Sequence, residues 1–436
     1  LDYLPKPLKD WAQRLHRSEA AMSWSLADQV VGSAQNFLVG VAVARLSGIT
    51  EFGTFTLVFV AAMLAYVAQD LFLGYPMLTF SGGRKRRTQP YFKAVVVWSL
   101  AVAMAAGLAI AACVFLIQWA QNETAPLRLL LGAVALTAAN NHFATVKRVA
   151  FALGRGSTGF ALGLARAGLL AVAAVAASLS GWHLDAATWF CLMGFAAAAA
   201  ALPLTLKFLT SGRTRPRLQL ALMTRHWIYA RWLLLMVLCS LGQEQLIWVW
   251  LGIIEGDAAV GAMRAGHYLL GTTHVVLMGM HNFIAREAAI AFAEGGHDGL
   301  THYLTQRTII LGVLIGVLLL TLALFAEFWM RVAFGSAYVA YAGTLRFYCV
   351  IYGVIFLREV WMIYLRTLEM TRPIFVSFAV SSAVAFMIAY PAIKTWGITG
   401  ALTVVLIANI ICGVLVAVAV HRARSAGLLA ASGSVG

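Results

Sequence analysis

The sequence is short of charge. Only 11% of its 436 residues are charged, whereas 61% are hydrophobic and the mean hydropathy is +0.83. A soluble domain carries about a quarter charged residues. This composition argues against a soluble globular protein. Apolar runs of about 18 or more residues recur along the chain, as in a polytopic membrane protein.

Cysteine is scarce, and signatures of common enzymes are missing. The five cysteines lie far apart inside apolar runs, so they predict neither disulfides nor a zinc site. The chain has no GxxxxGK[ST] phosphate loop, no GxSxG and no HExxH. We therefore expect no enzyme, no metal and no cofactor. Residues 1–20 are polar and basic, and we expect no cleavable signal peptide.

Apolar windows of about 20 residues predict twelve transmembrane helices with short connectors. The fold class is therefore an all-α integral membrane protein. The predicted spans lie near residues 26–46, 54–80, 91–118, 127–147, 158–180, 186–209, 228–252, 258–281, 307–330, 342–365, 374–393 and 399–420.

The distribution of cations predicts the orientation. With the N-terminus inside, the connectors on the cytoplasmic side and their flanks hold 22 Lys and Arg residues, against three on the other side. This bias places both termini in the cytoplasm. It also accounts for most of the +15 net charge, which favours contact with anionic lipid over nucleic acid.

A weak internal repeat at an offset of 208 residues relates the two halves of the chain. Gly48 and Gly53 align with Gly256 and Gly261, and the segment from Ala34 to Gly53 lies over the segment 242–261. The repeat predicts an N-terminal half, 1–212, and a C-terminal half, 213–436. These would be two parallel-related six-helix bundles around a central cavity.

The first predicted helix has one polar side. Six residues fall within about 160° of each other on a helical projection, and a membrane helix turns such a face to protein or water. For Asp28 and Gln29 the alternative is an interfacial first turn after a Ser25 cap; Gln35 and Asn36 lie too deep for that. The six residues are Asp28, Gln29, Gly32, Ser33, Gln35 and Asn36.

A second stripe lies on the predicted helix 258–281. His267, His274 and His281 are spaced by seven and share a face with Arg264. At about 10.5 Å per step, they are too far apart to hold one metal ion. They are either histidines with partners inside the bundle or titratable groups on a cavity wall.

Other ionisable residues also fall inside predicted spans. Each would cost about 3 kcal/mol if it faced lipid at mid-depth, so most must face inward. Arg358 and Glu359 suit structural pairing with neighbouring helices, and Arg346 can reach the outer interface. The polar residues 140–142 suit hydrogen bonds between helices. The full set is Asp70, Arg166, Glu244, Arg346, Arg358 and Glu359.

Arginines that topology does not explain favour an anionic cargo, because a guanidinium matches phosphate oxygens in two directions. The candidate substrate-binding residues are Arg166, Arg264, Gln35, Asn36, Gln243 and Glu244. The candidates for coupling to an ion are Asp28, Asp70, His267 and His274.

Four stretches carry a family resemblance: ADQVVGSAQNFLVGVAVARLSGITEFGTFTL (27–57), VKRVAFALGR (146–155), RHWIYARWLL (225–234) and EQLIWVWLGIIEGDAAVGAMRAGHYLLGTT (244–273). With the twelve-span plan, the chain resembles Wzx-type flippases for lipid-linked polysaccharide repeat units. These belong to the multidrug/oligosaccharidyl-lipid/polysaccharide exporter superfamily and are similar to lipid II flippases.

The resemblance implies a central cationic cavity and alternating access. The cargo would be an undecaprenyl-pyrophosphate-linked oligosaccharide for exopolysaccharide, capsule or O-antigen synthesis, moved from the inner to the outer leaflet. Membrane lipid, a polysaccharide polymerase and chain-length machinery are the implied partners. Two alternatives stay open: a drug or cation antiporter of the same superfamily, and a polysaccharide ligase or polymerase. The second needs a large exterior loop that the sequence lacks.

Overall fold

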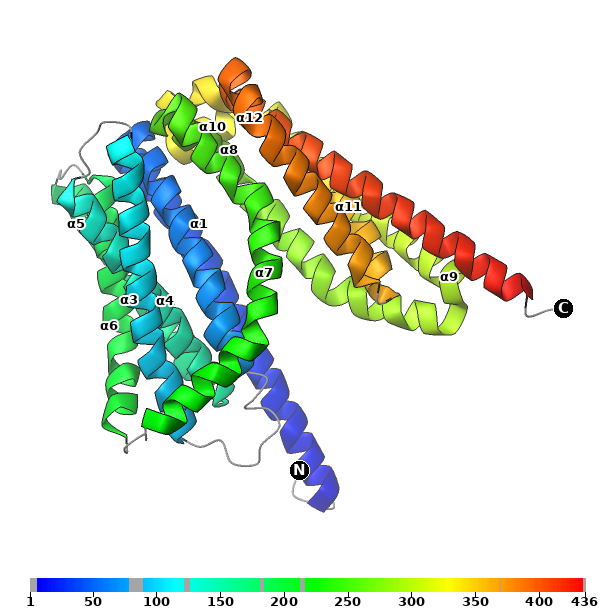
Figure 1. Ribbon diagram of the computed structural model, residues 1–436, viewed down its shortest axis with the longest axis horizontal. Coiled ribbons are helices and arrows are strands. Elements are labelled where there is room, and N and C mark those ends of the chain that lie inside the picture. The colour runs from blue at the N-terminus through cyan, green and yellow to red at the C-terminus, as the bar shows by residue number, and fades with distance from the viewer. Residues whose placement is uncertain are drawn as a thin grey trace. The chain divides into compact units, whose positions relative to one another are not determined.

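The computed structural model describes residues 6–77, 89–120, 126–180, 184–211, 216–368 and 370–433 (Figure 1). Every regular element in these ranges is a helix, and each predicted span falls on helical segments wherever it is described. The prediction of an all-α fold is confirmed. The reason is physical: in hydrocarbon a chain must satisfy its backbone hydrogen bonds internally, and a helix does so within one segment.

Membrane-length stretches are frequent. Within the described ranges, eight helical stretches are long and apolar enough to cross a bilayer. Two of them, Ala27–Met77 and Arg372–Ser425, have 51 and 54 residues, more than twice the length that one crossing needs. The chain is therefore a multi-pass membrane protein, and the count of twelve spans stays a prediction.

The chain folds into two compact units, each described here by itself. The first comprises Leu1–Ser47 and Val58–Met236, and the second comprises Gly48–Leu57 and Val237–Gly436. A short piece of the long first helix thus packs with the second unit. The two halves expected from the repeat, 1–212 and 213–436, stay a prediction.

In the first unit, α4 lies between α3 and α6. Glycines bring α4 and α6 to backbone contact: a Cβ on Gly132 would lie 2.9 Å from the Ala187 carbonyl oxygen, and one on Gly194 would lie 2.7 Å from that of Ala135. Small residues allow such close packing, which holds helices together in lipid. The elements are α1 (Lys6–Gln69), η1 (Asp70–Gly74), α3 (Gln89–Ala120), α4 (Leu127–Ala152), α5 (Gly156–Ser180), α6 (Ala186–Thr210) and α7 (Pro216–Glu255). Residues 48–57 of α1 and residues 237–255 of α7 belong to the second unit.

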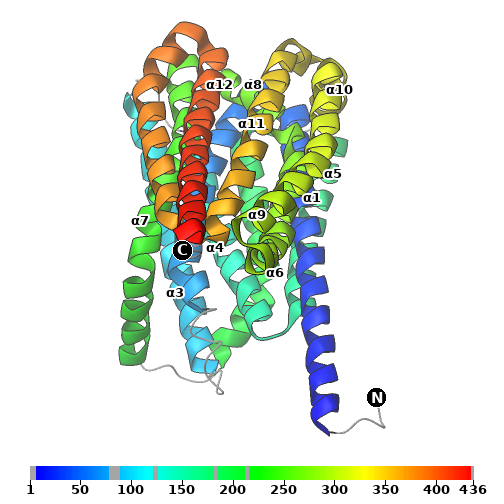
Figure 2. The ribbon, with the colours of Figure 1, turned by 90° about the vertical axis from the view of Figure 1, so that its right-hand side faces the viewer.

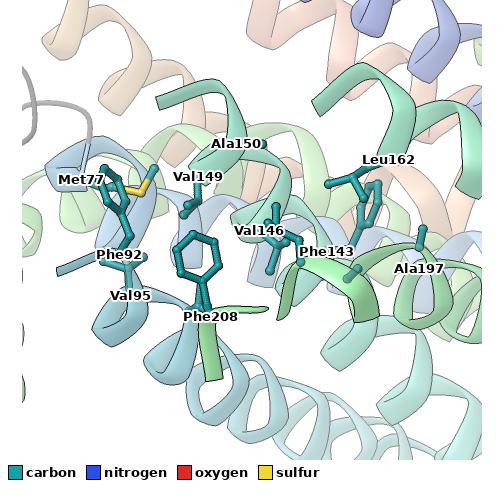
Figure 3. Packing of buried hydrophobic residues seen from close by; sticks show 14 residues of the cluster. Met77, Phe92, Val95, Phe143, Val146, Val149, Ala150, Leu162, Ala197 and Phe208 are labelled. Carbon is teal, nitrogen blue, oxygen red and sulfur yellow. The ribbon is translucent and has the colours of Figure 1, made fainter. Parts of the chain in front are cut away.

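Buried side chains fill the space around α4 towards one end of this unit. Phe143, Val146 and Val149 of α4 meet Phe92 of α3 and Phe208 of α6 in one cluster (Figure 3). All five are at most 6% exposed. The cluster fixes the rotation of α4 about its axis, and so decides where the neighbouring Lys147 and Arg148 point.

In the second unit, α11 packs against both α9 and α12 (Figure 2). α9 and α12 each contain a glycine with positive φ, Gly296 at 58° and Gly397 at 54°, where the chain leaves helical geometry. The elements are α8 (Asp257–Leu269), α9 (Gly271–Leu324), α10 (Ala326–Phe334), η2 (Ser336–Tyr341), α11 (Ala342–Thr367) and α12 (Thr371–Gly433).

The predicted repeat corresponds to a shared geometry. Gly48 has φ 85° and ψ 178°, and Gly256, its equivalent in the repeat, has φ 82° and ψ 174°. A helix begins directly after each, and the two helices touch through their glycines. A Cβ on Gly53 would lie 1.6 Å from the carbonyl oxygen of Asp257, and one on Gly261 would lie 2.2 Å from that of Ile49. The contact is reciprocal, since Ile49 and Asp257 also occupy equivalent positions in the two copies of the repeat.

Candidate functional site

Two adjacent cations on α4 pair with two aspartates that lie in α1 and at the start of η1. Lys147 Nζ lies 2.8 Å from Asp28 Oδ2, and Arg148 Nη1 lies 2.7 Å from Asp70 Oδ1. Consecutive residues on a helix point about 100° apart, so the two pairs lie on different sides of α4. Both predicted coupling aspartates are therefore held by basic partners.

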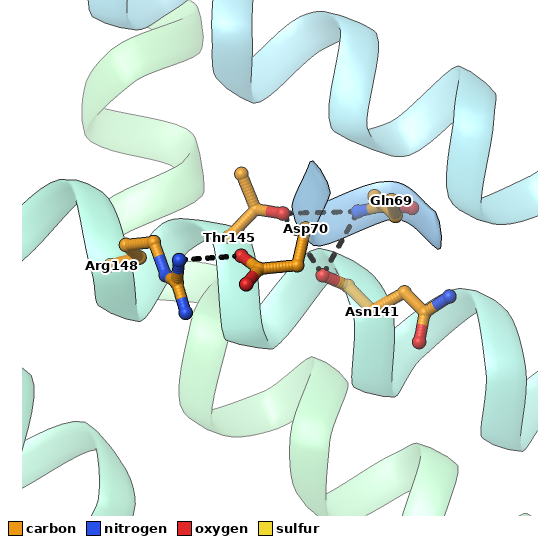
Figure 4. Close-up of polar contacts among 5 residues, drawn as sticks. All are labelled: Gln69, Asp70, Asn141, Thr145 and Arg148. Carbon is orange, nitrogen blue, oxygen red and sulfur yellow. Dashed lines mark hydrogen bonds and ion pairs between the residues drawn. The ribbon is translucent and has the colours of Figure 1, made fainter. Parts of the chain in front are cut away.

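Asp70 begins a π-helical turn, η1. A Cβ on Gly74 would lie 2.1 Å from Asp70 Oδ1, so the absence of a side chain there leaves room for the carboxylate. The preceding Gln69 is buried, and its Nε2 donates to the Asn141 carbonyl oxygen at 3.1 Å and to Thr145 Oγ1 at 3.0 Å (Figure 4). The π turn is thus fastened to α4 beside the Asp70–Arg148 pair. Such turns are frequent at functional sites.

A glycine of α5, Gly163, leaves room for the side chain of Asp28. Trp24 packs beside Gly156 of α5, and one helical turn later Asp28 lies beside Gly163. A Cβ at position 163 would be 2.6 Å from Asp28 Oδ1. The small-residue side of α5 therefore lets the carboxylate reach Lys147 across the helix interface.

Arg166 lies three residues beyond Gly163 on α5. Its Cζ is 5.2 Å from the centroid of the Phe143 ring, and Lys147 Nζ is 5.6 Å from the same centroid. Arg166 Nε is buried without a hydrogen-bond partner among the described groups, and no ion pair holds its guanidinium within them. Arg166 and Lys147, the second of which is paired with Asp28, therefore both contact one aromatic ring in the first unit.

The second unit holds a similar arrangement at Arg264. Its Cζ lies 4.8 Å from the ring centroid of Tyr268 and 5.5 Å from that of Trp248. No carboxylate in the described part of this unit forms an ion pair with it. His267, the next candidate on α8, packs edge-on against Trp248 and Tyr348, with ring centroids 6.0 and 5.3 Å away.

The polar side of the first helix is partly open. Gln35 is buried at 8% exposure, whereas Gln29, Ser33 and Asn36, spaced by four and three residues, are exposed. This spacing places the three exposed residues on one side of the helix. The side chains of Gln243, Glu244 and His274 lie outside the described residues, so their predicted roles stay predictions.

The predicted structural roles of His142, Arg358 and Glu359 are confirmed, whereas the buried side chain of Asn141 has no hydrogen-bond partner among the described groups. His142 joins three helices, with Nδ1 2.7 Å from Ser99 Oγ and Nε2 2.9 Å from Thr205 Oγ1. Arg358 and Glu359 form a buried pair at 2.7 Å. Arg346 is largely exposed and pairs with Glu327 at 3.0 Å. These residues hold helices together and are poor candidates for binding cargo.

The sequence reasoning missed Lys147 and Arg148 as site residues and counted them only as topology signals. The signal that could have found them is the segment VKRVAFALGR, which places two cations in the last turns of a membrane helix. Phe143, Trp248 and Tyr268 were also missed, because an aromatic ring under a cation has no sequence signature. Within the described residues, no three His, Cys, Asp or Glu side chains gather as a metal site would require.

Solved structures share this fold over nearly the whole chain. The lipid II flippase MurJ in an inward closed conformation has a TM-score of 0.66 at 10% identity, covering 92% of this chain and 87% of its own. An inward-facing multidrug resistance MATE transporter has a TM-score of 0.66 at 14% identity, with coverages of 93% and 98%. This chain has the fold of MOP-superfamily transporters.

A third similar structure is a MOP superfamily transporter from Pyrococcus furiosus, described as having a binding pocket of reversed polarity. Its TM-score is 0.58 at 12% identity, over 94% of this chain and 96% of its own. No family model and no curated protein matches the sequence. The structural likeness extends through both units. Because these three structures are only 10–14% identical to this chain, they show its fold and not its cargo.

Proposed function

We propose that the chain is a flippase for an undecaprenyl-pyrophosphate-linked oligosaccharide repeat unit. It moves this lipid from the inner to the outer leaflet of the bacterial cytoplasmic membrane by alternating access, for exopolysaccharide, capsule or O-antigen synthesis. A polysaccharide polymerase and chain-length machinery would act after it. Both termini lie in the cytoplasm in this proposal.

One observation carries the proposal: each unit holds an arginine on aromatic rings without a carboxylate partner among the described residues. Arg166 lies over Phe143, and Arg264 lies over Tyr268 and Trp248. A charge inside a membrane protein costs free energy unless it is paired or serves a function. An aromatic ring offers a guanidinium no carboxylate oxygen, so N–H groups of these arginines can donate to phosphate oxygens.

The remaining surface suits a lipid with a polar head. The exposed side of the first helix, Gln29, Ser33 and Asn36, offers hydrogen-bonding groups for sugar hydroxyls. Apolar side chains such as Leu108, Val172 and Leu314 are more than half exposed. Such outer faces suit hydrocarbon, in which the isoprenoid tail can stay while the head group crosses.

A drug or cation antiporter is the second candidate, since a MATE transporter reaches the same TM-score as MurJ. Such a protein needs carboxylates free to bind a cation. Here Asp28 and Asp70 are already paired with Lys147 and Arg148, which favours an anionic cargo. Uptake of a lipophilic cation into vesicles separates the two functions. The flippase proposal expects none above that of protein-free vesicles.

The test of the cargo is a mass measurement. Cells lacking the protein are expected to accumulate the undecaprenyl-pyrophosphate-linked repeat unit, identifiable by mass spectrometry of extracted lipids. Vesicles with purified protein are expected to expose that lipid to an external glycosidase. An unchanged lipid-linked sugar pool, together with no movement in vesicles, would refute the proposed function.

A topology prediction follows from the cation bias. In a chain without its native cysteines, single cysteines replacing Arg155 and Arg422 are expected to be shielded from an impermeant thiol reagent in intact cells. Cysteines replacing Arg128 and Lys394 are expected to react. All four native side chains are exposed in the described structure, so a lack of reaction is not caused by burial. Labelling of position 155 without lysis would reverse the orientation and the direction of transport.

A coupling prediction concerns protons. If Asp70 or His267 relays a proton, replacing Asp70 with Asn or His267 with Gln is expected to flatten the dependence of transport on pH. Asp70→Asn also removes one partner of the ion pair with Arg148. Transport is measured in vesicles between pH 5.5 and 8.5, the range chosen for the assay to span about the unperturbed histidine pKa. Unchanged profiles in both variants would leave the membrane potential as the driving force for an anionic cargo.

A further inference from the structure

We propose that Asp28 is an internal substitute for the cargo's diphosphate: it holds Lys147 while the site is empty and gives it up when the diphosphate binds. The inference rests on the proposed function and assigns a role to one residue of that site. Asp28 would thereby set how readily the head group is released.

The Asp28–Lys147 pair has the geometry of a cation holding an anion by two oxygens. Lys147 Nζ donates to both carboxylate oxygens of Asp28, at 2.8 Å and 3.1 Å. A phosphate group in place of the Asp28 carboxylate would present its oxygens to the Lys147 ammonium in the same way. The pair is accessible, with side chains 24% and 13% exposed, so an exchange of anions does not require the core to open.

A further cation, Arg166, contacts the same aromatic ring as Lys147. Arg166 and Lys147 share the Phe143 ring, at 5.2 and 5.6 Å from its centroid. Arg166 Nε is buried with no described hydrogen-bond partner. The cluster of Asp28, Lys147 and Arg166 has one positive charge in excess. It is therefore poised to receive an anion with more charge than one carboxylate, as a diphosphate has.

The position of the Asp28 carboxylate depends on a glycine of α5. Position 163 must be glycine for the carboxylate to sit where it does, because a Cβ would come within 2.6 Å of Oδ1. Gly168, five residues further along the same helix, has no atom within 4 Å of a built Cβ. The same substitution at these two positions therefore separates displacement of Asp28 from a general change in α5.

Replacing Asp28 is therefore expected to strengthen binding of the diphosphate and to slow turnover. Removing the internal anion frees Lys147 and raises the positive charge of the cluster, so a diphosphate binds more tightly. When the diphosphate leaves, no carboxylate at position 28 is then present to re-form the ion pair with Lys147. Tighter binding of the ground state does not speed transport, so Asp28→Asn should lower both the KM and the maximal rate.

The experiment measures affinity by calorimetry with the full chain in phosphatidylcholine nanodiscs. The probes are farnesyl diphosphate and inorganic pyrophosphate, which separate a lipid-linked head group from free pyrophosphate. Asp28→Asn is expected to bind farnesyl diphosphate about tenfold more tightly than wild type. Gly163→Ala should change affinity in the same direction, Gly168→Ala should not, and Lys147→Ala should abolish the gain.

The outcomes that overturn the inference differ from those that overturn the function. If wild type binds farnesyl diphosphate through Arg166, but neither Asp28→Asn nor Gly163→Ala binds more tightly, Asp28 is only structural and the flippase proposal stands. If wild type binds inorganic pyrophosphate alone, or neither probe, the cluster is no lipid head-group site and both proposals fall. Because Gly163→Ala leaves both charges in place, it also tests the inference if Asp28→Asn does not fold.

Discussion

Transport by Arg166→Ala and by Arg264→Ala is expected to fall about tenfold to a hundredfold below wild type, with normal insertion in the membrane. Each substitution removes a charge-assisted hydrogen bond to phosphate, which contributes about 1.5–3 kcal/mol, and about 1.4 kcal/mol corresponds to a factor of ten. Neither guanidinium pairs with a described carboxylate, so its loss strands no known buried partner. The measurement is the initial rate of lipid exposure in vesicles, normalised to protein content.

The matched control is Arg346→Ala, which removes an arginine 48% exposed and paired with Glu327 at the surface. It is expected to transport at the wild-type rate. Lysine at 166 or 264 should restore transport only in part, because an ammonium lacks the planar fork of donors. Full polysaccharide export by a well-expressed double variant, Arg166→Ala with Arg264→Ala, would refute the cationic mechanism.

The parts of the fold that depend on local sequence could be predicted. Apolar runs of membrane length must form helices, and these helices are in the structure. The internal repeat could also be found in the sequence, because glycine is needed where φ is positive and where two backbones touch. Gly48 and Gly256 meet the first requirement and Gly53 and Gly261 the second. Each of these requirements can therefore be recognised from the glycine at that position in the sequence.

The partners of Lys147 and Arg148 could not be predicted, because these two pairs join helices far apart in the chain. Lys147 and Asp28 are separated by 119 residues, and their contact depends on Gly163 of a third helix. Lys147 and Arg148 also belong to the cations that the topology prediction places on the cytoplasmic side. The sequence therefore did not distinguish them as partners of Asp28 and Asp70. The packing of residues 48–57 with the second unit likewise depends on the reciprocal contact with α8.

The largest expected loss of stability is at Arg358. Its guanidinium is 7% exposed and bonds to Glu359 at 2.7 Å and to Asn409 Oδ1 of α12 at 2.7 Å. It also lies over the ring of Phe378, 5.3 Å from its centroid. Arg358→Ala leaves the Glu359 carboxylate, 8% exposed, without this cation, at an expected cost of about 3–5 kcal/mol.

The comparison with a double variant shows where that cost arises. Replacing both residues, Arg358→Met with Glu359→Leu, removes the two charges together and is expected to be far less destabilising than Arg358→Ala alone, because no buried carboxylate then loses its counter-ion. The surface variant Arg346→Ala should cost about 1 kcal/mol or less. The midpoint of heat-induced unfolding in detergent measures all three. An unchanged midpoint in Arg358→Ala would mean that neither the ion pair with Glu359 nor the hydrogen bond from Arg358 to Asn409 of α12 stabilises the fold. If the double variant is as unstable as the single one, the loss comes from packing around Asn409 and Phe378.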